Sequence, residues 1–234
     1  MKCKALYSQP KDSEAVFEIP RFSDISQDLI DSLAAEHPGK KIVFRPGTPL
    51  FGDLEKLDGD LPETTFCQIG FIAEPARLSG PVPVRNERFH SRPPKDAAEL
   101  QFVIAQTYID DFAKPWEQYL GTALTQENLR LLLSLSNPTN TTLVEDGRPA
   151  GLVAFCQMTD CIGTHVEQVS WVWVRKDLER HDRASVHALL QAVLKQREAK
   201  VFQAGVHLKN RRSQRFFVKL GFQPRCIHCA PTVA

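Results

Sequence analysis

The sequence lacks several features that would assign it to a special class of protein. No apolar run approaches the roughly 20 residues that a membrane-spanning helix needs, and the opening stretch MKCKALYSQPKDSEAVFEIP contains no apolar core of a secretory signal. An excess of charge of one sign is also missing, because 29 basic and 28 acidic side chains leave a net charge of +1. We therefore expect a cytoplasmic protein with no membrane partner and no nucleic-acid partner.

Cysteine is sparse and forms no compact framework, since six cysteines are spread over 234 residues. Free thiols in a reducing compartment are the expected state. The stretch CIHC at residues 226–229 suggests zinc, with Cys156 and Cys161 as the second pair of ligands. Its spacing is not that of a zinc finger. We predict no metal, and keep a local disulfide or a redox role for Cys226 and Cys229 as alternatives to inert thiols.

The chain is long enough for one large domain or two small ones, and its 42% of hydrophobic residues can form a core. Residues 1–80 are irregular: a helix is expected over 22–36, short strands over 41–44 and 66–73, and turns over the Pro-, Gly- and Asp-rich stretch 46–62. A Ser-Gly-Pro stretch near residue 80 predicts a boundary. We expect an N-terminal segment 1–80 of unknown role, with a degenerate second copy of the following domain as an alternative, and a domain over 81–234.

The second part of the chain has a regular order of elements. The apolar periodicity and the turn residues predict helices, a hairpin with an Asp-Gly turn, and further strands. Their expected ranges are helices 96–112 and 125–135, hairpin 141–157, strand 166–174, helix 184–197, strand 201–208 and helix 213–220. This order predicts an α/β layer in which helices cover a sheet.

The stretch NRRSQRFFVKLGF, residues 210–222, follows the last of these strands. Gly221 stands where a helix favours a left-handed C-terminal cap. The stretch resembles the last conserved block of the GNAT superfamily, the Gcn5-related N-acetyltransferases, which reads approximately N-x-x-A-x-x-L/F-Y-x-K-L-G-F. Eight residues fit this block without a gap: Asn210, Ser213, Phe216, Phe217, Lys219, Leu220, Gly221 and Phe222. The resemblance covers about residues 82–234.

The resemblance implies a GNAT fold of the α/β (α+β) class, with a mixed central sheet flanked by helices and an added N-terminal α/β segment. It also implies an acyltransferase that moves an acetyl or other acyl group from acyl-CoA to an amine. Acetyl-CoA is the expected co-substrate, and the acceptor is a small-molecule or protein amine. A homodimer is a further expectation. A non-catalytic module that binds a ligand or partner, and an enzyme that uses an acyl carrier protein as donor, remain as alternatives.

The resemblance places cofactor-binding residues in three segments. In GNAT proteins the pyrophosphate of CoA binds the loop after the central strand, usually R/Q-x-x-G-x-G/A, and the N-terminus of the next helix. The matching residues here contain neither glycine: Arg180, His181, Asp182, Arg183, Ala184, Ser185 and Val186. Val172 and Val174 on the central strand, and Asn210, Ser213 and Phe217 in the last block, complete the expected contacts. Asn210 has helix capping as an alternative role.

Catalytic groups follow from the same resemblance. Glu167, at the start of the central strand, is the candidate general base, and an ordinary strand-end carboxylate is its alternative. Ser170 could lie on the reactive face instead, because alternation alone does not fix the face. In the family, a Tyr of the last block acts as the general acid. Phe217 stands at that position here and has no proton to donate. His207 is a second catalytic candidate, with packing as its alternative.

Two further sets of side chains have both a structural and a functional interpretation. Trp171 and Trp173 share one strand face, where they pack in the core or line an acceptor pocket, and core packing is preferred. Arg211, Arg212 and Arg215 form a solvated helix face or contact the phosphates at the adenine side of the cofactor. We prefer the solvated face.

Overall fold

The computed structural model describes residues 4–7, 14–47, 49, 51–62, 66–78, 87–111, 133, 139–159 and 165–230. The chain divides into two compact units. Unit 1 contains Met1–Arg77, Met158–Val166 and Lys200–Ala234, and unit 2 contains Leu78–Gln157 and Glu167–Ala199. The N-terminal segment therefore shares a unit with the C-terminal strands. A domain boundary near residue 80 stays a prediction, because spatial grouping does not test which segment folds alone.

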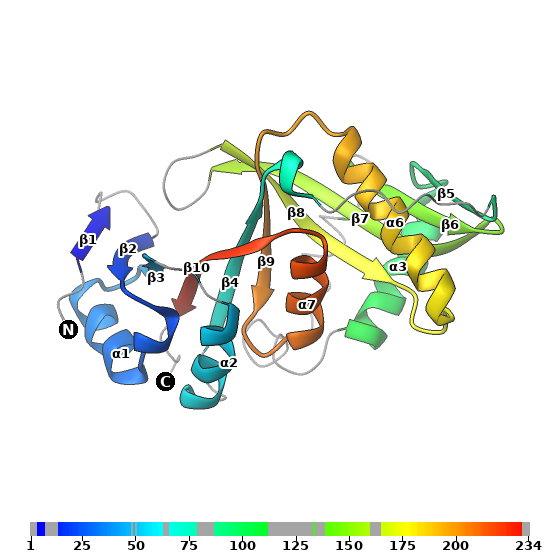
Figure 1. Cartoon of the computed structure of the whole chain (residues 1–234). Helices are drawn as coiled ribbons and strands as arrows, with labels where there is room; N and C mark the ends of the chain where they lie inside the picture. The colour runs from blue at the N-terminus through cyan, green and yellow to red at the C-terminus, as the bar shows by residue number, and fades with distance from the viewer. Residues whose placement is uncertain are drawn as a thin grey trace. The chain divides into compact units, whose positions relative to one another are not determined.

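Unit 1 is a sheet with helices. Its elements are β1 (Lys4–Tyr7), β2 (Glu14–Ile19), η1 (Phe22–Asp24), α1 (Gln27–Glu36), β3 (Lys41–Pro46), α2 (Phe51–Asp60), β4 (Phe66–Ala73), η2 (Pro75–Arg77), β9 (Phe202–His207), α7 (Arg211–Lys219) and β10 (Gln223–Ala230). The strand order is β1-β2-β3-β10-β4-β9 (Figure 1). The β2–β3 pair is parallel and the others are antiparallel, so the predicted mixed sheet is confirmed.

Strand β4 has a position that the sequence did not predict. It lies between β9 and β10 and pairs antiparallel with both, as Figure 1 shows. A strand of the N-terminal segment thus lies between two strands of the C-terminal part and pairs with both. One face of this sheet carries Phe71, which stacks on Phe217 of α7 with ring centroids 6.4 Å apart. The opposite face carries Gly70 and Cys226, which are register partners.

Two predictions in the N-terminal part were wrong in detail. The helix expected over 22–36 is a 3-10 turn followed by α1, whose N-cap is Ser26. Ser26 Oγ accepts the Leu29 N–H at 3.3 Å. The stretch 46–62, expected to be turns, contains α2. Leu54 and Leu57 of α2 are fully buried, and this burial stabilises a helix despite Gly52 and Gly59.

Unit 2 is also built of strands and helices. Its elements are β5 (Phe89–Arg92), α3 (Ala97–Asp111), β6 (Thr141–Glu145), β7 (Arg148–Thr159), β8 (His165–Val174) and α6 (Arg180–Gln196), with the ends of β7 and β8 in unit 1. The strand order is β8-β7-β6-β5. The predicted helix over 96–112, the hairpin and the central strand are confirmed. The helix expected over 125–135 lies outside the described residues.

The two helices of unit 2 pack on opposite faces of its sheet. Leu152 of β7 is buried against α3 in a cluster that includes Trp173. Gly151, the neighbouring residue, points the other way: a Cβ there would lie 3.2 Å from Val186 Cγ1 of α6. Successive strand residues face opposite sides, so α3 covers one face and α6 the other. Among the described residues, no helix is long and apolar enough to cross a membrane.

Candidate active site

Helix α6 begins four residues earlier than the sequence predicted. Its N-cap is Glu179, and the Arg183 N–H already donates to the Glu179 carbonyl at 2.9 Å. The residues expected in a phosphate-binding loop, 180–186, are therefore helical, which corrects that prediction. The N–H groups of the first turn, at Arg180, His181 and Asp182, precede the helical hydrogen bonds and remain available to an anion.

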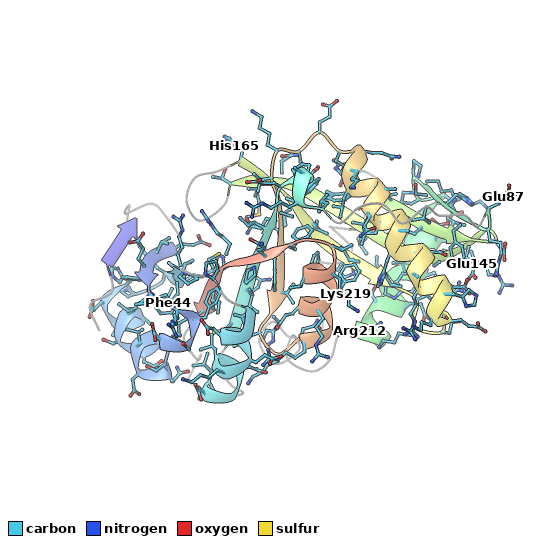
Figure 2. The ribbon with its side chains drawn as sticks, in the orientation of Figure 1. Phe44, Glu87, Glu145, His165, Arg212 and Lys219 are labelled. Atoms are coloured by element: carbon cyan, nitrogen blue, oxygen red, sulfur yellow. The ribbon has the colours of Figure 1, made fainter. Side chains whose placement is uncertain are left out.

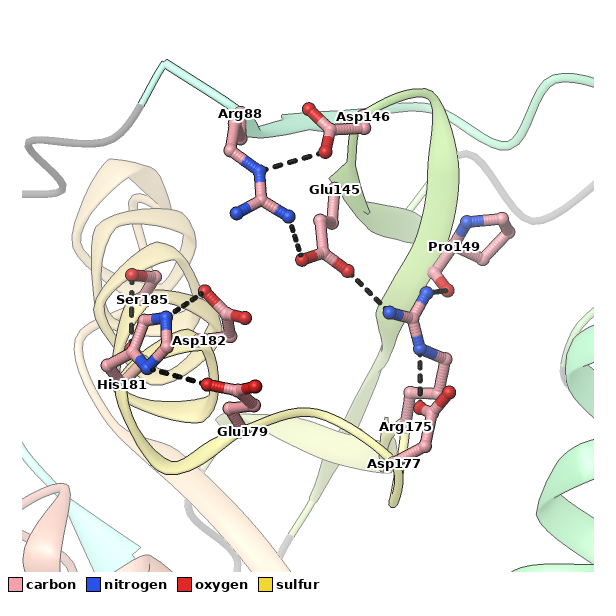
Figure 3. Close-up of polar contacts among 10 residues, drawn as sticks. All are labelled: Arg88, Glu145, Asp146, Pro149, Arg175, Asp177, Glu179, His181, Asp182 and Ser185. Carbon is pink, nitrogen blue, oxygen red and sulfur yellow. Dashed lines mark hydrogen bonds and ion pairs between the residues drawn. The ribbon is translucent and has the colours of Figure 1, made fainter.

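The side chains of the first turn of α6 interact mainly with one another (Figure 3). His181 lies between two carboxylates, with Nδ1 3.4 Å from Glu179 Oε2 and Nε2 3.3 Å from Asp182 Oδ1. Ser185 Oγ donates to the His181 carbonyl at 3.3 Å, and the Arg183 guanidinium donates to the carbonyl of Lys176. Arg183 and Ser185 are thus engaged within the chain, whereas Arg180 is exposed at the helix start.

A network of ion pairs faces this helix start (Figure 3). Glu145, at the end of β6, is 7% exposed and accepts from Arg88 at 2.8 Å and from Arg175. Arg88 also donates to Asp146 at 2.8 Å, which raises the pKa of Arg88. Arg175 donates to Asp177 at 2.7 Å. These two arginines are neutralised by protein carboxylates. Sequence reasoning missed Glu145, whose only signal was its place before the Asp-Gly turn.

Val186 occupies the position where the family has glycine or alanine, and the structure explains how it fits. Its side chain is fully buried against the sheet, where residue 151 is glycine. The small residue that permits close packing is thus supplied by β7 instead of α6. The first-turn N–H groups and Arg180 fit the negative end of an acyl-CoA. The carboxylates of Glu179 and Asp182 weaken that fit.

Glu167, the candidate base, is held in a buried ion pair. It is 3% exposed, and both carboxylate oxygens accept from Arg197: Oε2 from Nε at 2.7 Å and Oε1 from Nη2. Gln157 Nε2 donates to Oε1 at 3.3 Å. The Arg197 guanidinium also lies over the Phe155 ring, 4.5 Å from its centroid. This geometry is that of a structural pair anchoring the C-terminal end of α6, and a role of Glu167 as base stays a prediction.

Side chains in the middle of β8 contact β7 and the core on the α3 side. Ser170 Oγ donates to Cys156 Sγ of β7 at 2.9 Å. The next residue, Trp171, packs against the same α3-side cluster as Trp173. The core role of the tryptophans is confirmed, and the part-buried Val172 and Val174 point to the other side.

The stretch 210–222, which resembles the last conserved block of the family, lies in unit 1. It forms the turn from β9 into α7 and α7 itself. Asn210 is the N-cap, and its Oδ1 accepts the Ser213 N–H at 3.0 Å; its capping role is confirmed. Phe217 is 6% exposed and packs against Phe71 and Phe222. The cofactor contacts expected of Asn210, Ser213 and Phe217 stay predictions.

His207 is a buried histidine that stays neutral near pH 7. Its Nδ1 accepts the Lys209 N–H at 3.1 Å, and the residue is 3% exposed. Burial, with a smaller effect of the Lys209 charge, lowers the pKa of His207 to about 4. Lys209 and Arg211 both pair with Asp58 of α2, at 2.9 and 2.8 Å. The expectation that Arg211 is solvated is therefore wrong, whereas Arg212 and Arg215 are exposed.

Comparison with known proteins identifies the family. The model of the acetyltransferase (GNAT) family matches residues 103–222, which include β8, α6, β9 and α7. No curated protein matches the chain.

Solved structures give weaker similarities. A functionally unknown conserved protein from Staphylococcus epidermidis is 12% identical over 99% of this chain and 95% of its own, with a TM-score of 0.48. A tandem GNAT protein from the clavulanic acid biosynthesis pathway is 13% identical over 89% and 69%, with a TM-score of 0.46. A GCN5-related N-acetyltransferase from Kribbella flavida is 14% identical over 97% and 88%, with a TM-score of 0.43. Because the family model covers more than half of the sequence, the chain belongs to the acetyltransferase (GNAT) family.

Proposed function

We propose that the protein is a cytoplasmic acyltransferase that moves an acetyl or other acyl group from acyl-CoA to an amine of a small molecule or protein. The observation that carries the proposal is the family match over residues 103–222, which contains both the β8–α6 segment and the motif of α7. Members of this family generally use acyl-CoA. A fold alone does not fix an activity, so the residues must supply the further support.

In this proposal, some of the residues expected from the sequence hold the donor. The first-turn N–H groups of α6 and the Arg180 guanidinium hold its diphosphate. The main chain at Val172 and Val174 of β8 contacts the pantetheine. The bound donor supplies an activated thioester carbonyl. Ser185 and Arg183 act within the helix start rather than on the donor, because both already have protein partners.

Positioning of the amine contributes most of the rate in this proposal. Both oxygens of Glu167 already accept hydrogen bonds from Arg197, and these bonds oppose a role as base. His207 is neutral near pH 7 and can accept a proton, but its low pKa makes it a weak base. Phe217 offers no proton to the leaving thiolate. Holding two reactants in a productive geometry can itself lower a barrier by several kcal/mol.

A thiol-release assay with acetyl-CoA and a panel of amines tests the proposal. We expect amine-dependent release of CoA. Arg180→Gln should raise the donor KM and leave kcat nearly unchanged, as expected for uniform binding. Lys195→Gln is the matched control, since Lys195 is exposed in the last turn of α6. If the thiol is released from an acyl-carrier thioester but not from acetyl-CoA, the donor is an acyl carrier protein and not acyl-CoA.

A non-catalytic binding module is the second candidate. The helical first turn of α6, with Asp182 buried in it, and the absence of a tyrosine at Phe217 favour this candidate. Calorimetry with acetyl-CoA separates the two. No heat and no thermal shift at high acetyl-CoA concentration, together with no turnover of any thioester, would favour the module.

A further inference from the structure

Unit 1 contains a cluster of three side chains that no part of the acyl-transfer chemistry uses. Cys226 and His228 lie two residues apart on one face of β10, and Glu14 of β2 lies on the same side of the sheet. Cys226 Sγ is 3.3 Å from His228 Nε2. On the other side of the ring, His228 Nδ1 is 3.3 Å from Glu14 Oε1. The three groups form a continuous chain from thiol to imidazole to carboxylate.

Thiol, imidazole and carboxylate, in this order, are the groups that activate a nucleophile. A carboxylate on one imidazole nitrogen orients the ring and favours its protonated form, and the other nitrogen then takes the proton of the thiol. The hydrogen bond with His228 is the largest influence on Glu14 and lowers the pKa of that carboxyl. Lys41, the register partner of Glu14 on β3, acts in the same direction. A carboxylate whose pKa is lowered therefore lies against His228 Nδ1.

The sheet makes room for the sulfur at one particular position. Gly70 of β4 is the register partner of Cys226, and a Cβ at Gly70 would lie 2.7 Å from Cys226 Sγ. A side chain there would force the sulfur to move from its present position. Cys226 is 3% exposed, whereas the side chains of His228 and Glu14 are 17% and 26% exposed. A large substrate cannot reach this thiol, so its reaction partner must be small.

We propose that Cys226 is a modification site, a thiolate activated by His228 and Glu14 that reacts with peroxide. The thiolate sulfur attacks one peroxide oxygen, so an S–O bond forms and the O–O bond breaks. Sulfur is oxidised by two electrons to a sulfenic acid, and the peroxide is reduced. The leaving hydroxide takes the imidazolium proton of His228 and departs as water. The neutral imidazole can then accept a hydrogen bond from the sulfenic acid.

The test measures how much of each thiol survives hydrogen peroxide in the folded protein. The native chain is treated with peroxide, quenched with catalase, denatured and alkylated with iodoacetamide, and mass spectrometry with fragmentation separates Cys226 from Cys229. An ordinary thiol is only a few per cent thiolate at pH 7, so full activation corresponds to a rate about 30-fold above that of a free cysteine. Cys156, a part-buried thiol bonded to Ser170, is the internal control. We expect Cys226 to be lost much faster than Cys156.

Variants separate activation from simple access. His228→Gln and Glu14→Gln should slow the loss of Cys226 at pH 7, His228→Gln more strongly, while circular dichroism shows an unchanged fold. Gly70→Ala should slow it by displacing the sulfur with both partners intact. Loss of Cys226 at the Cys156 rate in the unaltered chain, or an unchanged rate in both Gln variants, would overturn the proposal. None of these readouts depends on acyl-CoA, so they stand apart from the acyltransferase assay.

Discussion

Replacing Glu167 by glutamine distinguishes the two roles that this carboxylate can have. In the structure both its oxygens are bound by Arg197, and the residue is 3% exposed. Glutamine keeps the shape but removes the charge, and its amide N–H group faces the guanidinium. Breaking a buried ion pair costs about 3–5 kcal/mol. Arg197 retains 27% side-chain exposure and some hydration, so we expect the lower end, about 3 kcal/mol.

Thermal and urea unfolding measure this effect. For a chain of this size each kcal/mol corresponds to about 2–4 °C, so the melting temperature should fall by about 6–12 °C. Glu198→Gln is the matched control, because Glu198 is exposed and lies outside α6, so the change should alter stability by less than about 0.5 kcal/mol. Figure 2 shows the side chains of the described residues on the ribbon. An unchanged melting temperature, together with a kcat lowered on the order of 10²-fold, would refute the structural role and restore Glu167 as the base.

Three further changes test other parts of the structure. Gly151→Ala places a Cβ 2.9 Å from the Trp173 carbonyl oxygen and 3.2 Å from Val186 Cγ1, so overpacking should lower the free energy of unfolding by about 1–3 kcal/mol; urea titration with no change would show that α6 can shift freely. Asn210→Ala removes the cap of α7 and should cost about 1 kcal/mol, whereas Asn210→Ser, scanned by calorimetry, should recover most of it. The pKa of His207 falls from 6.5 to about 4 on folding, so the unfolded chain binds the proton more readily and stability should decrease as the pH is lowered from 6.5 towards 4. His207→Gln should reduce this dependence in urea titrations at each pH, and an equal dependence in both chains would contradict the buried, neutral state of the histidine.

Local patterns predicted the regular elements well. The Asp-Gly turn gave the hairpin of β6 and β7, and the apolar stripe of residues 184–197 gave most of α6. The motif at Asn210 gave both the cap of α7 and its glycine end, where Gly221 has φ of 98°. In each case the signal lies within a few residues of the element, so the local sequence is sufficient.

Long-range pairing was not predictable from the same patterns. The position of β4 between β9 and β10 depends on contacts across more than 100 residues. Helix α2 was missed because its Gly and Asp residues favour turns locally, and the burial of its two leucines cannot be read from the local sequence. The start of α6 was placed too late because the family's glycine loop was expected there, and the buried pairing of Glu167 with Arg197 has no sequence signature.

Calorimetric titration of the full chain with acetyl-CoA, joined to CoA release in the presence of an amine, tests the proposed activity most directly. We expect saturable heat and amine-dependent release, with weaker binding of acetyl-CoA after Arg180→Gln. No heat and no release with acetyl-CoA or with an acyl-carrier thioester would contradict the proposal that this GNAT protein transfers acyl groups.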